Sequence, residues 1–268
     1  MVFLSGDRSQ ARATGADAKG SRELVSVSKE EGLIRIGLNR PDKRNALSLE
    51  LVSQLKTTIE THRHEPSVLL ISSTTPNMFI AGADIAELSA RGEEEAFRAI
   101  NVELFNAIAA WRWPSIAAID GPALGGGLEC ALACDLRVAS PRARFAQPEL
   151  GLGILAGAGG NWRLPDLVGI GWARRMLYLG EMIDAVQAHA IGLVDRLAED
   201  PIVAAIEWSV QIRRQPWRAL EITKLALATG GRASSGLIDV LGQAILFESQ
   251  EKRERMQSFL ERRQSFAH

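Results

Sequence analysis

The residues of this chain whose types and spacing suit chemistry are two glutamates and a run of three glycines. Glu129 closely follows the glycines at 125–127, and Glu149 lies further along the chain beside Pro148. Two carboxyl groups that share one water can act as base and acid, and their mutual repulsion makes their protonation a property of the pair. Exposed N–H groups at the start of a helix attract negative charge. Together these groups suit a reaction in which protons move while an oxygen atom becomes negatively charged.

Each of these features is weak when taken alone. Most triple glycines are explained by turns or by close helix packing, and a glutamate in the first turn of a helix is most often explained by its favourable interaction with the helix dipole. Two further segments are also rich in small residues, FIAGADI at 79–85 and FAQPELGLGILAGAGGNWRLP at 145–165. Small residues let a ligand approach the backbone closely. The combination therefore favours a binding or catalytic site.

The apolar pattern predicts alternating strands and helices through the first two-thirds of the chain. Period-2 patterning at 24–28 and 32–38 indicates a β-hairpin. Further strands are expected to begin at Ser67, Pro114 and Asp135, with a polar helix near 92–111 before the second of them. From residue 158 onward the pattern indicates helices only. The glycine run thus lies between a strand and a short helix.

A helix is also expected after Ser48, which is placed to cap its first turn. Its apolar face would consist of Leu51, Leu55 and Ile59, which recur at the helical spacing.

Composition excludes several classes of protein. Hydrophobic residues make up 46% of the chain and charged residues 24%, which is typical of a folded globular protein. The net charge of −1, from 31 basic and 32 acidic residues, provides no long-range positive field for nucleic acid or an anionic membrane. No apolar run approaches the roughly 18 residues needed to cross a bilayer. We expect residues 1–22 to form a mobile tail and the protein to be cytoplasmic.

Other candidate sites find little support in the sequence. Cys130 and Cys134 are predicted to be small buried residues, because two cysteines without nearby histidines suit neither a disulfide framework nor a zinc site. The four histidines lie outside every motif, so a Ser-His-Asp triad and a metal centre are not indicated. The segment GLGILAG at 151–157 has the wrong glycine spacing for a dinucleotide-binding turn, and Pro148 interrupts the strand before it.

Taken together, five segments resemble the enoyl-CoA hydratase/isomerase, or crotonase, superfamily. In chain order they are NRPDKRNALS (39–48), AGADI (81–85), GPALGGGLECALACD (121–135), FAQPELGLG (145–153) and GAGGNWRLP (157–165). The resemblance runs from about residue 23 to the C-terminus. It implies an α/β fold, a crotonase-like spiral of ββα units with a C-terminal α-helical trimerisation region. We accordingly expect a core with the CoA and active sites at 23–200 and an oligomerisation region at 201–268, giving a homotrimer or homohexamer.

The resemblance also implies roles for particular residues. The backbone N–H groups of Ala83 and Gly126 would form the oxyanion hole for a thioester carbonyl, and Glu129 and Glu149 match the family's two catalytic glutamates. The residues expected to bind CoA and substrate are Lys43, Arg44, Ala46, Ala81, Asp84, Ile85, Phe259 and Arg262. The last two fall where the family's final helix touches the nucleotide end, often across a subunit boundary. No metal is expected, and no cofactor beyond the coenzyme A that forms part of the substrate.

The function that we expect is hydration of a trans-2-enoyl-CoA to a 3-hydroxyacyl-CoA. The alternatives are double-bond isomerisation, dehydration of a specialised hydroxyacyl-CoA, C–C bond hydrolysis, and non-catalytic binding of acyl-CoA. Both glutamates are present, which favours hydration, since isomerases of this kind commonly manage with one. The chain departs from the family pattern at Ala156 and at Asn161-Trp162, where proline and Thr-Gln are common. Trp162 either shapes the acyl pocket or fills the core, and we expect core packing because large aromatic side chains are usually buried.

Overall fold

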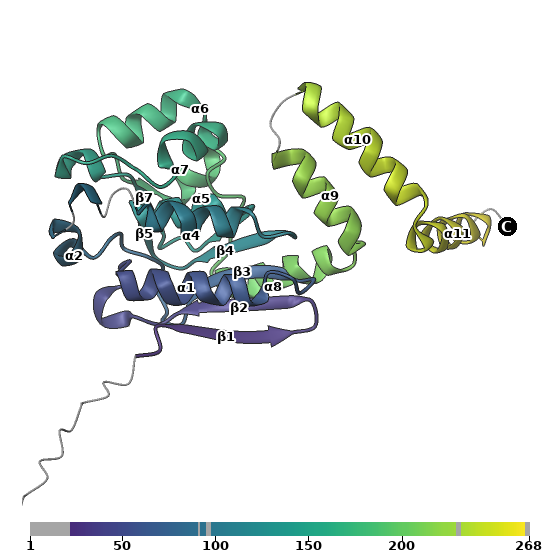
Figure 1. The fold of residues 1–268 in the computed structure, drawn as a ribbon, viewed down its shortest axis with the longest axis horizontal. Coiled ribbons are helices and arrows are strands. Elements are labelled where there is room, and N and C mark those ends of the chain that lie inside the picture. Colours follow the sequence, from purple (N-terminus) through teal and green to yellow (C-terminus); the bar gives the residue numbers. More distant parts are fainter. Residues whose placement is uncertain (1–21, 91, 95–97, 229–231, 266–268) are drawn as a thin grey trace, which may run out of the picture.

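The computed structural model of the chain describes residues 22–90, 92–94, 98–228 and 232–265. Residues 1–21 of the expected tail lie outside these ranges. The described residues form two β-sheets with helices packed around them (Figure 1).

The main sheet has six strands in the order β1-β2-β3-β4-β6-β9. Their bounds are β1 (Val25–Glu30), β2 (Leu33–Leu38), β3 (Val68–Ser73), β4 (Ser115–Ile119), β6 (Leu136–Ala139) and β9 (Arg196–Leu197). The first two strands pair antiparallel, which confirms the predicted hairpin, and all the other pairings in this sheet are parallel.

A second sheet contains β5 (Pro122–Leu124), β7 (Arg144–Ala146) and β8 (Ile183–Asp184), in that order. The chain therefore leaves the main sheet after β4, returns for β6 and leaves again for β7. The prediction of helices alone beyond residue 158 was wrong, because β8 and β9 lie there. Each has only two residues, too few to show a period of two.

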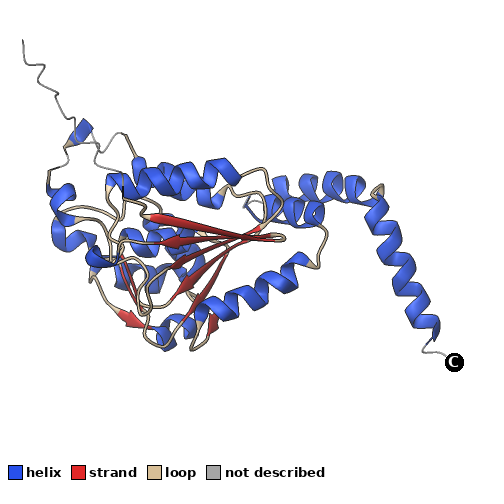
Figure 2. Ribbon diagram, turned by 90° about the horizontal axis from the view of Figure 1, so that it is seen from below, coloured by secondary structure: helices blue, strands red, loops and turns tan. Residues whose placement is uncertain are grey.

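Helices cover both faces of the main sheet, and Figure 2 shows the strands between them. Leu69 and Ile71 of β3 pack in one apolar cluster with α1 (Leu49–His62), α4 (Ile100–Ala109) and α5 (Gly126–Ala133). Leu70, between them in sequence, belongs to the opposite cluster with α8 (Pro201–Arg213). Because successive side chains of a strand point to opposite faces, one apolar run serves both layers.

The first helix begins as expected. The Ser48 hydroxyl accepts a hydrogen bond from the Leu51 N–H at 3.2 Å, and Leu51, Leu55 and Ile59 are buried on the inner face of α1. Within the span of the polar helix expected near 92–111, α4 runs from Ile100 to Ala109.

The C-terminal helices extend away from the sheets. After α9 (Trp217–Ala228), the helices α10 (Arg232–Phe247) and α11 (Gln250–Ser265) lie beyond the core (Figure 1). The contacts of α9 with the core include an ion pair of Lys224 with Asp135 at 2.7 Å and an edge-on contact of Trp217 with Trp113. The remaining helices are α2 (Ile85–Ser89), α6 (Gly160–Tyr178) and α7 (Ala185–Ala190). None of the helices in the described ranges is long and apolar enough to cross a membrane.

A buried cation, Arg137, connects β6 to the segment that leads into β9. Its side chain is 3% exposed and forms an ion pair with Asp195 at 3.1 Å. It also donates hydrogen bonds to the carbonyl oxygens of Leu193 and Cys134, both at 2.8 Å.

We expect Arg137→Met to lower the free energy of unfolding by about 2–5 kcal/mol, because two buried carbonyl groups lose a donor and Asp195 loses its ion-pair partner. Urea unfolding at a fixed protein concentration measures this loss. Arg196→Met is the matched control, since the exposed pair of Arg196 with Glu207 contributes at most about 1 kcal/mol. Equal losses in the two variants would contradict the assigned role of Arg137.

Candidate active site

Glu129 is positioned by the glycine turn at which α5 begins. Gly125 adopts φ +51°, and a β-carbon there would lie 2.7 Å from a carboxylate oxygen of Glu149. A β-carbon at Gly127 would lie 2.1 Å from the carbonyl oxygen of Ile80. Both positions therefore require glycine, the first for conformation and space and the second for close packing of the helix. Glu129 follows in the first turn.

The Glu129 carboxylate is 3% exposed and has two backbone donors. The N–H groups of Ala158 and Gly160 donate to its Oε1 atom at 2.7 and 2.9 Å. Burial raises the pKa of Glu129, while these two hydrogen bonds and the positive charge of Arg163 oppose the increase. One oxygen of the carboxylate is thus fixed by the backbone.

The second glutamate, Glu149, begins the short 3-10 helix Glu149–Leu152 that follows β7. It is 9% exposed, and burial together with the negative charge of Glu129 raises its pKa to about 7, although a backbone hydrogen bond opposes the shift. A group with this pKa exchanges protons readily near neutral pH.

Gln147, which was not among the predicted site residues, contacts Glu149. Its side chain is buried, and its amide nitrogen, oriented to satisfy its neighbours, donates to both carboxylate oxygens at 3.0 and 3.1 Å. The available signal was its place in the motif FAQPELGLG, two residues before Glu149.

The two carboxyl groups lie close together. The Gly160 N–H donates to Glu129, and a β-carbon at Gly160 would lie 2.8 Å from one polar atom of the Gln147 side-chain amide, whose other polar atom contacts Glu149. The electrostatic effect of Glu129 on the pKa of Glu149 agrees with this proximity. The arrangement provides two coupled acid–base groups shielded from bulk water.

The segment that holds Ala83 lies beside the start of α5. Ala83 pairs with Leu47 in a parallel bridge, in which the Leu47 N–H donates to Gly82 and the Asp84 N–H donates to Leu47. Because these bonds use the residues on either side of Ala83, its own N–H points away from Leu47. The Gly126 N–H is in the first turn of α5, where it has no acceptor within the helix.

The loop at 43–47 is held by a residue that the sequence analysis did not single out. Asn45 is buried with φ +54°, and its amide nitrogen donates to the Ser73 hydroxyl at 3.0 Å and to the Phe79 carbonyl at 2.9 Å. The Ala81 N–H in turn donates to the carbonyl of Arg44. The structure therefore brings Lys43, Arg44 and Ala46 next to Ala81.

Lys43 and Arg44 project from this loop as exposed cations. Neither forms an ion pair within the described part of the chain.

The side chain of Asp84 is occupied by other protein groups. Arg40 donates to it at 2.8 Å, and it accepts from the Ala86 N–H at the start of α2. The guanidinium of Arg40 lowers the pKa of Asp84. Arg40 also donates to the Ala46 carbonyl, so this pair joins the two segments, while Ile85 beside it is exposed.

Two expected CoA contacts are not placed by the structure. Phe259 and Arg262 belong to α11, but their side chains lie outside the described residues.

The expectation that Trp162 fills the core was wrong. Its side chain is 55% exposed, and the Arg163 guanidinium lies 3.9 Å from the centre of its ring. The indole packs on the buried guanidinium of Arg163 and otherwise stays exposed, so its apolar area is not covered by other apolar side chains.

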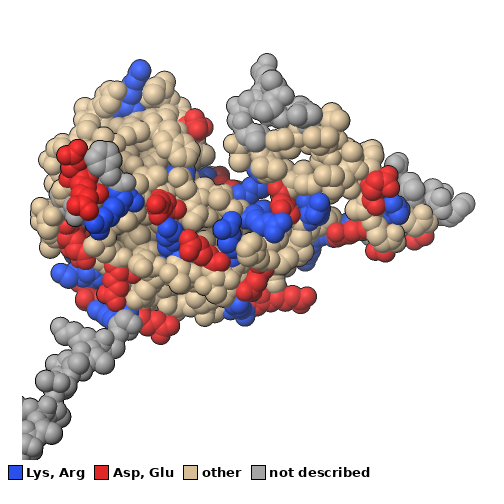
Figure 3. Space-filling model, in the orientation of Figure 1, with Lys and Arg blue, Asp and Glu red and all other residues tan. Residues whose placement is uncertain are grey.

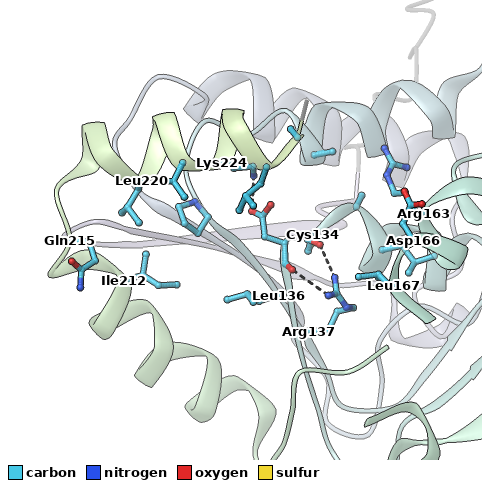
Figure 4. A pocket seen from close by; sticks show the side chains of 18 of the residues that line it. Cys134, Leu136, Arg137, Arg163, Asp166, Leu167, Ile212, Gln215, Leu220 and Lys224 are labelled. Atoms are coloured by element: carbon cyan, nitrogen blue, oxygen red, sulfur yellow. Dashed lines mark hydrogen bonds and ion pairs between the residues drawn. The ribbon is translucent and has the colours of Figure 1, made fainter. Parts of the chain in front are cut away.

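A cavity of about 650 Å³ lies apart from the two glutamates. Figure 4 shows its walls, with Leu220 and Lys224 of α9 opposite Leu136 of β6, and with Arg163 at the far side. Its lining is mostly apolar, and neither Glu129 nor Glu149 belongs to it. The coupled acid–base pair, rather than the size of this cavity, identifies the candidate active site.

Comparisons with known proteins agree with the geometry. The family model described as enoyl-CoA hydratase/isomerase matches residues 28–268. A crotonyl-CoA hydratase of Syntrophomonas wolfei is 38% identical over 256 residues, which cover 91% of this chain and 97% of that protein. A short-chain-enoyl-CoA hydratase of Clostridium acetobutylicum is 32% identical, with 89% of this chain and 95% of that protein covered.

A solved structure of an enoyl-CoA hydratase from Bacillus anthracis superposes with a TM-score of 0.85 at 30% identity, and the match covers 89% of this chain and 96% of that one. This likeness confirms the predicted α/β crotonase-like fold, whereas the trimerisation region stays a prediction. From the extent of the family match and the identity of these relatives, the chain belongs to the enoyl-CoA hydratase/isomerase family.

Proposed function

We propose that the protein is an enoyl-CoA hydratase, which adds water across the 2,3-double bond of a 2-enoyl-CoA to give a 3-hydroxyacyl-CoA. The observation that carries the proposal is the pair of buried, coupled glutamates with different hydrogen-bond partners. Relatives that are named crotonyl-CoA hydratase and short-chain-enoyl-CoA hydratase support it.

The hydrogen-bond partners of the two carboxyl groups support the assignment of one as base and the other as acid. Two N–H groups fix Oε1 of Glu129, which leaves Oε2 to accept a proton from water as the oxygen attacks the β-carbon. Glu149, whose pKa is about 7, holds a proton that passes to the α-carbon. The amide of Gln147 then stabilises the carboxylate that this transfer leaves. Each such role typically contributes about 10² to 10⁴ in rate.

The thioester carbonyl becomes negatively charged during this addition. In the proposal the N–H groups of Ala83 and Gly126 donate to its oxygen, and each important donor of this kind contributes about 3–4 kcal/mol. Support comes from the parallel bridge, which turns the Ala83 N–H away from Leu47, and from the place of Gly126 at the start of α5.

Other reactions of the family use fewer of these groups. Double-bond isomerisation commonly needs one carboxyl group, and non-catalytic acyl-CoA binding needs none. Dehydration of a specialised hydroxyacyl-CoA and C–C hydrolysis remain alternatives on the same scaffold. The burial and coupling of both glutamates favour hydration.

The nucleotide end of the substrate requires a local site, because charges of both signs are mixed over the face in Figure 3. We propose that Lys43 and Arg44 supply it. Both are exposed, and the loop that carries them adjoins Ala81 and, through Leu47, the backbone of Ala83.

We also propose that the C-terminal helices assemble a homotrimer or homohexamer. The support is the apolar surface of α10, where Val240, Leu241, Ile245 and Phe247 are exposed.

Replacing each glutamate by glutamine tests hydration directly, because glutamine keeps the size but cannot exchange a proton. We expect Glu129→Gln and Glu149→Gln each to reduce turnover of crotonyl-CoA by about 10² to 10⁴, with substrate affinity nearly unchanged. The double variant should lose much less than the product of the single effects, since the two groups act as a unit. Steady-state kinetics and binding measurements provide the values.

If Glu129→Gln kept full activity on the best substrate while Glu149→Gln was inactive, a one-acid reaction such as isomerisation would replace hydration.

Removing the cations of the loop should weaken substrate binding more than catalysis. We expect the double variant Lys43→Ala/Arg44→Ala to raise KM for crotonyl-CoA, most strongly at low salt, with a smaller fall in kcat, because exposed charges act at long range only when unscreened. The control is Lys29→Ala/Arg112→Ala, which removes two cations already paired with Glu65 and Glu221. An unchanged KM at low ionic strength would argue against the assignment.

Assembly is tested by the mass of the protein in solution. Light scattering at micromolar concentration should give three or six times the mass of one chain. Leu241→Glu/Ile245→Glu, which places charge on the apolar surface of α10, should lower that mass while circular dichroism stays unchanged. A monomeric wild-type protein would contradict the proposal.

A further inference from the structure

We propose that Arg163 is a positioning residue for Glu129: it fixes the turn at 158–160 that holds the carboxylate and keeps a buried positive charge beside it. This inference rests on the proposed hydration, because it assigns Glu129 the task of a base.

The contacts of Arg163 surround that turn. Its Nη1 atom donates to the Ala158 carbonyl at 3.1 Å, and its Nη2 atom donates to Oδ1 of Asn106 in α4 at 2.8 Å. The N–H of the same Ala158 donates to Glu129. One residue thus receives a hydrogen bond from the arginine and gives one to the glutamate, so a shift of the guanidinium moves a donor of the carboxylate.

The turn is shaped to admit the guanidinium. Gly159 adopts φ +123°, and a β-carbon there would lie 2.1 Å from Nη1 of Arg163. A side chain at this position would displace the arginine as well as strain the backbone. The indole of Trp162 covers the guanidinium from outside, and Figure 4 shows Arg163 on the α6 side of the cavity.

In the part of the chain that the structure describes, the guanidinium of Arg163 is buried without a carboxylate in direct contact. Arg163 is 7% exposed, and within the described ranges no carboxylate lies within ion-pair distance of it. Burial lowers the pKa of Arg163, which the negative charge of Glu129 opposes. A buried cation without a contacting anion is costly, unless its field stabilises a charge nearby.

Glu129 is the group that this field stabilises. The charged groups that act on Glu129 are Arg163 of α6 and, when it is ionised, Glu149 of the segment after β7, while Cys130 is its neighbour along α5. Burial raises the pKa of the Cys130 thiol well above its usual value, so this thiol stays neutral. Arg163 is therefore the positive charge that offsets the burial of Glu129 and helps to keep it ionised while Glu149 holds its proton.

Arginine suits this task better than lysine. Its planar fork reaches two acceptors, Ala158 and Asn106, while its face stacks on Trp162. A lysine would keep the charge but could not hold both acceptors in the same geometry.

Two substitutions separate the charge from the geometry. In Arg163→Gln, we expect kcat for crotonyl-CoA to fall by about 10-fold to 100-fold, as for other partners that orient a functional group, with KM changed less than about twofold. The acidic limb of the pH profile of kcat/KM should move to higher pH. The sign follows because the base must be ionised, and loss of the neighbouring positive charge raises the pKa below which it is protonated.

In Arg163→Lys, the acidic limb should stay at its wild-type position while kcat falls to an intermediate value. The matched control is Arg175→Gln, which removes another arginine of α6 that stacks on a tryptophan but pairs with the surface residue Glu181. Its kinetics and pH profile should match those of the wild type.

The outcomes separate this inference from the proposed function. If the wild-type protein hydrates none of a panel of enoyl-CoA thioesters, the proposed function fails first. If the wild type is active but the acidic limb of Arg163→Gln stays at its wild-type position, the guanidinium does not act on the protonation of Glu129 and the inference is overturned. Should Arg163→Gln fail to fold, Asn106→Leu removes only the acceptor of Nη2. A fall in its kcat at unchanged KM then supports the inference, and a wild-type kcat overturns it.

Discussion

Placing two carboxyl groups next to each other inside a protein carries a large electrostatic cost, and much of the structure around Glu129 and Glu149 serves to meet it. Each group is removed from water, which favours its neutral form, and each repels the charge of the other. Backbone N–H groups compensate Glu129, and a side-chain amide contacts Glu149. In the proposed hydration, this difference in partners makes Glu129 the group that accepts a proton and Glu149 the group that gives one.

The need to compensate two buried carboxyl groups also explains the glycines around them. Donors can reach a buried carboxylate only if the backbone approaches closely, and a β-carbon at Gly125, Gly127 or Gly160 would collide with a neighbouring group. The close contact of Gly127 with Ile80 also locks α5 to the segment that carries Ala83. The acid–base groups and the candidate carbonyl site are therefore packed against one another rather than carried on separate loops.

Local patterns in the sequence predicted local structure well. The hairpin, the cap at Ser48 and the family motifs all depend on residues near one another in the chain. Asn45 escaped notice because its partner Phe79 reaches it only when distant segments meet in space. Gln147 escaped notice because the sequence does not show how its side chain turns toward Glu149. The error at Trp162 has a similar origin, since burial statistics do not show that an arginine will cover the ring.

The bridge between Leu47 and Ala83 has a consequence for how binding energy is used. The loop at 43–47 carries the cations proposed to bind the nucleotide, and its backbone also holds the segment of Ala83, whose N–H is proposed to donate to the thioester. Contacts made far from the reacting bond therefore bear on the alignment of the group that stabilises the developing charge. A substrate shortened to its acyl and pantetheine parts would therefore show lower turnover as well as weaker binding. The reason is that part of the binding energy of the nucleotide serves to align the groups that stabilise the transition state.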